Sequence, residues 1–342
     1  MSVTIKEIAS VAGVSRGTVD RVLHNRKDVN SEVARQIQDL ADRMGYIPNR
    51  AGKVLAARKQ QIKFGCLLPD TSNPFFNSVI DGFHRAESEL TDYGVTVDIL
   101  LVQGFDQQAH IEGIRKMAAA GYSGICVTTL DVPEVQKEIF VITQQNVPVV
   151  SVNTDIPDSG RICYVGPDYE KAGRTAAGML SLTAHEPLHI LVISGSFKIR
   201  GHNERIKGFR SGLMLHHIDA EITKTVEAFD DLEDAYRLTK QILSDQPDIN
   251  CIFIAAGGVP GVYRAVKELH RPPITMLVFD ELPEIRQAIK EGGINFTICQ
   301  EPEIQGYTGI MRLFSWLMEG GKKSAADYIT HTIIKIADNI DD

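Results

Sequence analysis

The sequence predicts an α/β protein with an N-terminal three-helix, helix-turn-helix domain and a body of two doubly wound parallel-sheet lobes. Three observations lead to this prediction. The length of 342 residues favours two or three compact units rather than one. Residues 1–59 carry eleven Lys or Arg against six Asp or Glu, whereas the remainder carries 25 against 38. From residue 62 onward, short apolar runs alternate with amphipathic stretches.

Composition excludes several classes of protein. A content of 43% hydrophobic and 23% charged residues is ordinary for a soluble globular chain. No apolar run approaches the roughly 18 residues of a membrane span, and the N-terminus lacks a signal-peptide pattern. We therefore expect a cytoplasmic protein that does not contact a membrane. Scattered cysteines without CxxC spacing predict buried free thiols, at Cys66, Cys126, Cys163, Cys251 and Cys299.

The basic head has the element order of a helix-turn-helix. Thr4 and Glu7 have capping-box spacing, and Gly13 suits a helix stop. Ser15 begins a second helix that runs to about residue 24, and a third helix is expected over 31–44. A generic helical bundle would share the apolar pattern. It would not need polar or small residues on the outer N-terminal face of the second helix, which a recognition helix presents to the major groove: Arg16, Gly17, Thr18 and Arg21.

The stretch TIKEIASVAGVSRGTVDRVLHNR, continued by VNSEVARQIQDLADRMGYIPNRAGKVLAARK, resembles the N-terminal domain of the lac-repressor/gal-repressor family of bacterial transcription regulators. The resemblance runs from Thr4 to Lys59. It implies that three positions read bases: Arg16, Gly17 and Arg21. It implies phosphate contacts from Thr4, Ser15, Thr18, Asn25 and Asn49. Because glycine has no side chain, sequence discrimination is expected to rest on the two arginines, which suit bidentate contact with guanine.

Asp20 departs from the family pattern, which usually has serine at this position. One turn separates Asp20 from Arg16, so an i,i+4 ion pair is one interpretation. An acceptor for cytosine N4 is the other. The ion pair is favoured, because phosphates repel a carboxylate.

Pro48 ends the third helical region, and NRAGKVLAARKQQ then predicts a short helix and a tether. The resemblance implies a hinge helix that orders on operator DNA, with Leu55 wedged into the minor groove. A simple linker is the alternative. The expected domains are 1–46 for DNA binding, 47–60 for the hinge and 61–342 for the body.

Nine apolar runs in the body predict parallel strands joined by crossover helices: IKFGCLLP, VTVDILLV, GICVTTL, VPVVSVN, ICYVG, HILVISG, INCIFIAA, ITMLVFD and FTICQ. The expected N-lobe comprises about 62–165 and 300–326, and the expected C-lobe about 166–298. Ligands of such sheets bind beyond the carboxyl ends of the strands. We therefore expect a binding cleft between the lobes.

The body, over about 62–330, resembles the family's effector domain and the periplasmic ribose-type binding proteins, most specifically in LLPDTSNPFFNSVIDGF. The resemblance implies ligand contacts from Asp70, Asn73, Phe75, Phe76, Phe229, Asp280 and Gln300. For isolated residues, a turn at Asn73 and a core role for the phenylalanines are the alternatives.

The body also departs from the ribose-binder pattern at three places. Asn153 and Thr154 stand in place of an Asp-Arg pair, Asn203 in place of an Arg, and Ala256-Gly257 in place of an acid-amide pair. These changes predict a less ionic pocket for a sugar, polyol or cyclitol. The nearby cations Lys198, Arg200 and Arg205 leave a sugar phosphate open.

Together these features predict a ligand-responsive transcriptional regulator that binds operator double-stranded DNA as a homodimer; repression is implied by the resemblance. A transport-type binding protein would predict a signal peptide and no basic head. A sugar-acting enzyme would predict a nucleophile or acid/base set, and none stands out, so no enzymatic activity and no cofactor are expected. No metal site is expected, because His216-His217 and the pair of His202 and Glu204 lack a matched third ligand.

Overall fold

The computed structural model describes residues 3–23, 29–44, 61–70, 73–183, 187–270, 272–321 and 325–341. The chain divides into two compact units, 1–59 and 60–342, which are described separately. In the described part of the chain, no helix is long and apolar enough to cross a membrane.

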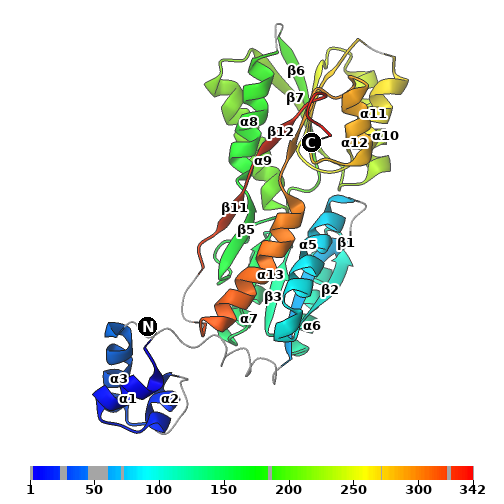
Figure 1. Ribbon diagram of the computed structural model, residues 1–342. Helices are drawn as coiled ribbons and strands as arrows, with labels where there is room; N and C mark the ends of the chain where they lie inside the picture. The colour runs from blue at the N-terminus through cyan, green and yellow to red at the C-terminus, as the bar shows by residue number, and fades with distance from the viewer. Residues whose placement is uncertain are drawn as a thin grey trace. The chain divides into compact units, whose positions relative to one another are not determined.

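The described residues of the first unit form three short helices: α1 (Ile5–Ala12), α2 (Arg16–Leu23) and α3 (Ser31–Arg43) (Figure 1). The predicted capping box is confirmed, because Glu7 N donates to Thr4 Oγ1 at 3.3 Å and Thr4 N donates to Glu7 Oε2 at 2.7 Å. Gly13 ends α1 with φ 66°, a left-handed conformation that glycine adopts without steric cost. The three helices pack around a common apolar core that includes Ile8, Val19, Val22, Ile37 and Ala41.

Two six-stranded sheets form the second unit and confirm the predicted pair of lobes (Figure 1). The N-lobe sheet is parallel throughout, in the order β11-β5-β4-β3-β1-β2. Its strands are β1 (Ile62–Asp70), β2 (Val95–Gln103), β3 (Gly124–Val127), β4 (Val149–Val152), β5 (Cys163–Pro167) and β11 (Tyr328–Thr330). Its helices are α5 (Phe75–Glu89), the 3-10 helix η1 (Thr91–Tyr93), α6 (Gln107–Ala119), α7 (Pro133–Gln144) and α13 (Pro302–Met318).

The C-lobe sheet has the order β12-β10-β9-β8-β6-β7, and β12 is antiparallel to β10. Its strands are β6 (Leu188–Ser194), β7 (Ala220–Glu227), β8 (Cys251–Ile254), β9 (Thr275–Phe279), β10 (Phe296–Cys299) and β12 (Ile333–Lys335). Its helices are α8 (Tyr169–Ser181), α9 (Arg200–Leu215), α10 (Leu232–Asp245), α11 (Val259–Glu268) and α12 (Pro283–Lys290). The chain passes between the lobes after β5, after β10 and after β11.

Alternating side chains place helices on both faces of each sheet, as a doubly wound fold requires. In β6, Ile190 and Val192 belong to the core that includes α8 and α9, whereas Leu191 and Ile193 belong to the core that includes α10, α11 and α12. All five cysteines are buried and free, as the sequence predicted. Burial raises the pKa of the Cys251 thiol to about 12, which keeps it protonated at neutral pH.

Helices α8 and α9 cross so closely that only glycine fits at the contact. A Cβ on Gly173 would meet the backbone carbonyl of Arg205, and a Cβ on Gly208 would meet the backbone carbonyl of Glu170. Because backbone atoms cannot move aside as a flexible side chain can, this crossing fixes where α9 lies against α8.

Replacing Gly173 with alanine is therefore expected to destabilise the second unit by about 1–3 kcal/mol, the usual cost of overpacking. Gly178→Ala is a matched control on the same helix, since its nearest neighbour is the imidazole of His216 at 3.3 Å. Alanine there should be neutral or stabilising, because glycine costs about 1 kcal/mol in a helix. Urea unfolding followed by circular dichroism compares the two variants, and equal stabilities would contradict the close crossing.

Candidate functional site: a recognition helix and an interlobe cleft

The first unit presents a polar face on α2. Ser15 starts the helix by accepting a hydrogen bond from Thr18 N at 3.0 Å. Val19 and Val22 turn into the core. The predicted base-reading residues are exposed, namely Arg16, Gly17 and Arg21. The helix therefore leaves two guanidinium groups accessible beside its buried face, which is the arrangement that a major-groove reader needs.

The other predicted DNA contacts are placed as follows. The Thr4 hydroxyl lies within the capping box, 2.9 Å from Glu7 Oε2. The hydroxyls of Ser15 and Thr18 lie 2.9 Å apart. Asp20 is partly buried on α2. Three predicted contacts fall outside the described residues: Asn25, Asn49 and Leu55.

In the second unit, a cavity lies at the carboxyl ends of strands from both lobes, as expected for this class of sheet. The N-lobe contributes Asn73, Phe75, Phe76 and Asn153. The C-lobe contributes Tyr169, Ile199, His202, Arg205, Asp230, Ala256, Gly257 and Asp280. Gln300, where the chain leaves β10 for the N-lobe, completes the lining. The cavity volume is ≈ 30 Å³, about the share of one water molecule in the liquid. The lobes are thus closed on each other, and a sugar-sized ligand requires them to separate or side chains to shift.

The N-lobe wall is built by the first turn of α5 and the turn after β4. Asn73 Oδ1 accepts from Phe75 N at 3.1 Å, so this side chain also shapes the turn. The rings of Phe75 and Phe76 meet edge to face, with centroids 5.3 Å apart. Asn153 has φ 66° and donates from Nδ2 to Gln305 Oε1 at 3.2 Å. Amide groups and aromatic surface therefore lie together on this wall.

The C-lobe wall carries two aspartates at strand ends. Asp280 has φ 71°, and its Oδ1 accepts from Gln300 Nε2 at 2.5 Å. Burial raises the pKa of the Asp280 carboxyl, while the charge of Arg205 acts in the opposite direction. Asp230 Oδ1 accepts from Gly257 N at 2.9 Å. Gln300 Oε1 is buried and has no hydrogen-bond partner, so it can accept from a ligand hydroxyl.

Arg205 lines the cavity with a positively charged guanidinium group, and the residue is only 3% exposed. Its guanidinium carbon lies 3.8 Å from the Phe279 ring centroid and 4.7 Å from that of Tyr169. Nη1 donates to the carbonyl of Ala255 at 2.9 Å, whereas Nε has no hydrogen-bond partner. The cavity nevertheless contains charged groups, because a buried arginine and two aspartates line it.

His202 is the second cavity residue on α9 that the sequence analysis did not assign to the pocket. Burial lowers the pKa of its imidazole, and Nδ1 accepts from Ser196 N at 3.1 Å, so the ring is neutral at pH 7. His202 and Arg205 lie three residues apart on α9, and Ile199, the N-cap residue of this helix, precedes His202 by the same interval. That spacing is a signal from which the cavity face could have been predicted.

Four predicted ligand residues do not line the cavity. Asp70 is exposed at the end of β1. Asn203 is exposed and donates from Nδ2 to the carbonyl of Phe197 at 2.7 Å. Thr154 is buried, and its Oγ1 accepts from Gly201 N at 3.4 Å. Phe229 is 48% exposed, with its ring centroid 6.0 Å from that of Phe105 in the other lobe.

Comparison with known proteins accounts for both units. The sequence model of "Bacterial regulatory proteins, lacI family" matches residues 4–49, and that of "Periplasmic binding protein domain" matches residues 64–323. The protein named "Probable HTH-type transcriptional repressor ExuR", from Bacillus subtilis (strain 168), is 27% identical over 289 residues and 82% of each chain. Catabolite control protein A from Staphylococcus epidermidis is 26% identical over 74% of each chain.

Among solved structures, GanP, a glucose-galactose binding protein from Geobacillus stearothermophilus, superposes with a TM-score of 0.76 at 26% identity. The superposition covers 82% of this chain and 99% of GanP. The two sequence models together span nearly the whole chain, one in each unit. The chain belongs to the lacI family of bacterial regulatory proteins, which join a helix-turn-helix domain to a periplasmic-binding-protein-like domain.

Proposed function

We propose that this chain represses transcription by binding operator DNA as a homodimer, and that a small polyhydroxylated effector controls this binding. One observation carries the proposal: a single chain joins a helix-turn-helix with exposed arginines to a cleft with polar walls from two lobes. Because operator DNA lies in the bacterial cytoplasm, the protein acts there. The cleft binds and does not catalyse, in line with relatives that are regulators and sugar-binding proteins.

The groups around the cavity favour an uncharged effector. Asp230 and Asp280 offer acceptors, Arg205 offers donors, and amides add both kinds of partner. Aromatic rings at Phe75 and Phe76 suit the C–H faces of a sugar. An anionic ligand would bring its charge beside two carboxyl groups against a single guanidinium. A neutral sugar, polyol or cyclitol therefore fits better than a sugar phosphate.

The positions of Lys198, Arg200 and Arg205, the cations that made a sugar phosphate a possible effector, also favour a neutral ligand. Arg200 is paired with Asp131 and Glu204, and Lys198 is exposed. Neither residue lines the cavity. Arg205 alone of the three reaches it.

Effector control follows from the two-lobed design. A ligand shifts DNA affinity only through a difference in its affinity for the two lobe arrangements. A change between the closed and open arrangements rotates one lobe relative to the other in each protomer. In a homodimer this rotation changes the spacing of the two DNA-binding domains, which must match two half-sites.

The experiment that tests the proposal has two steps. A duplex is first selected from a random DNA pool with the full-length protein. Thermal shift is then measured with neutral compounds (D-ribose, D-glucose, sorbitol, myo-inositol) and with D-glucuronate and glucose 6-phosphate. We expect a neutral compound to raise the Tm by mass action and to release the duplex. Failure to select any duplex would overturn the DNA-binding role, and release by anionic compounds alone would overturn the effector class.

A further inference from the structure

The N-terminal end of α9 reaches out of the C-lobe and contacts the N-lobe. Ile199 is 8% exposed and packs in the N-lobe core, which includes Leu130. The carbonyl of Lys198 accepts from Asp131 N at 3.0 Å. Gly201 N donates to Thr154 Oγ1 at 3.4 Å. A C-lobe segment therefore makes apolar and hydrogen-bonded contacts with the other lobe.

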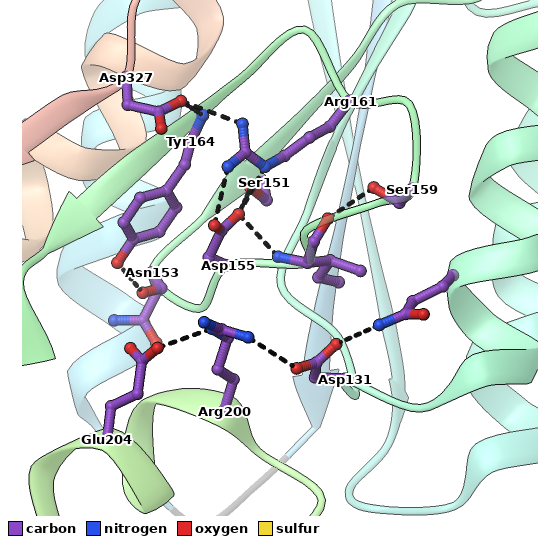
Figure 2. A network of polar contacts seen from close by, with 12 residues as sticks. Asp131, Ser151, Asn153, Asp155, Ser159, Arg161, Tyr164, Arg200, Glu204 and Asp327 are labelled. Carbon is purple, nitrogen blue, oxygen red and sulfur yellow. Dashed lines mark hydrogen bonds and ion pairs between the residues drawn. The ribbon is translucent and has the colours of Figure 1, made fainter. Parts of the chain in front are cut away.

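An ion pair adds to these contacts between the lobes. Arg200 Nη1 is 3.5 Å from Asp131 Oδ2 in the N-lobe, and Arg200 Nε is 2.7 Å from Glu204 Oε1 on its own helix (Figure 2). Asp131 Oδ1 accepts from Gln136 Nε2 at 2.7 Å, so the carboxylate is held from its own lobe. In the same view, Arg161 pairs with residues of the N-lobe, whereas Arg200 joins the two lobes.

We infer that Arg200 and Asp131 form an ionic clasp that holds the lobes closed and thereby sets how far an effector must shift the lobe equilibrium. Separating the lobes breaks the ion pair and withdraws Ile199 from the N-lobe core. The same helix end carries His202 and Arg205 to the cavity, so the clasp also positions that wall. Arg200 is thus a positioning residue. The effect of the clasp on the response to an effector rests on the proposed function.

The strength of the clasp follows from its exposure. The side chain of Arg200 is 38% exposed and that of Asp131 is 16% exposed, so water screens the pair in part. Ion pairs of this kind shift an equilibrium by roughly two- to fivefold. The clasp therefore adjusts the lobe equilibrium without locking it.

The test measures lobe separation without DNA or effector, so its outcome judges the clasp and not the proposed function. Spin labels are placed at Ser88→Cys in the N-lobe and Asp245→Cys in the C-lobe, two exposed positions, and their separation is measured by pulsed electron spin resonance. Arg200→Gln and Asp131→Asn are each expected to lower the closed-to-open ratio two- to fivefold. The double variant should lower it no further than the single variants do.

Arg174→Gln is the matched control. Arg174 is 39% exposed and pairs with Glu170 at 2.8 Å, with the i,i+4 spacing that Arg200 has to Glu204. Both residues lie on α8 within the C-lobe, so this pair does not join the lobes. In Arg174→Gln, the distribution of distances between the two spin labels should match that of the parent protein. An unchanged distribution in Arg200→Gln and Asp131→Asn would overturn the clasp, as would equal shifts in the control. A parent protein that already shows the distribution of the variants would also overturn it.

Discussion

Replacing Arg205 with glutamine is expected to weaken effector binding by about 100-fold, because hydrogen bonds to charged groups contribute roughly 1.5–3 kcal/mol each. Arg205 is buried, its Nε has no protein partner, and it is the guanidinium that faces the cavity. Its loss also removes the positive charge that acts on the buried carboxyl group of Asp280. Removing one partner from buried charges typically costs about 3–5 kcal/mol of folding free energy.

A second substitution separates binding from folding. Adding Asp280→Asn to Arg205→Gln removes the carboxyl group on which the charge of Arg205 acts, so stability should recover in urea unfolding. Effector affinity should not recover, because the guanidinium donor is still missing and Asp280→Asn also replaces an acceptor. Calorimetric titration uses the neutral compound identified by thermal shift, and Arg210→Gln is the control on the same helix, at an exposed position. Arg205→Gln with unchanged affinity would remove this residue from the binding site.

The fold could be predicted because its interior strands carry a strong local signal. β1, β3, β4, β6, β8 and β9 are apolar and buried along almost their whole length, and each was predicted from an apolar run. Three strands were not predicted: β7, β11 and β12. All three lie at sheet edges, and Thr330 is the one fully buried residue among them. An edge strand has a neighbour on one side alone, so its sequence need not be continuously apolar.

The site could be predicted only in part, for a geometrical reason. Strand-end residues such as Asp280 and Gln300 follow recognisable apolar runs, so their place at the cleft follows from topology. On α9, by contrast, the family arginine was assigned to Asn203, whereas Arg205 faces the cavity. Two residues along a helix turn a side chain through about 200°, since each residue advances 100°. Residues two apart on α9 therefore lie on nearly opposite faces, and the sequence alone did not show which of them faces the cavity.

The largest effect expected in the first unit is that of Arg21→Ala on operator recognition. Arg21 is exposed on α2, next to the buried Val22. If it contacts guanine bidentately, its loss should weaken binding to the selected duplex by roughly 1–3 kcal/mol and relax preference at one base pair. Gly17 has no side chain with which to compensate.

A base contact and a phosphate contact differ in which duplexes they affect, and this difference makes the prediction decisive. Binding of Arg21→Ala is titrated against the selected duplex, single-base-pair variants of it and a scrambled duplex at one salt concentration. Loss of a base contact lowers affinity for the selected duplex and leaves the scrambled one nearly unchanged, because phosphates are present in both. Arg35→Ala, exposed on α3 outside the recognition helix, should preserve the preference at every base pair. An equal loss on selected and scrambled duplexes would show that Arg21 contacts phosphate alone, and base reading by α2 would then rest on Arg16.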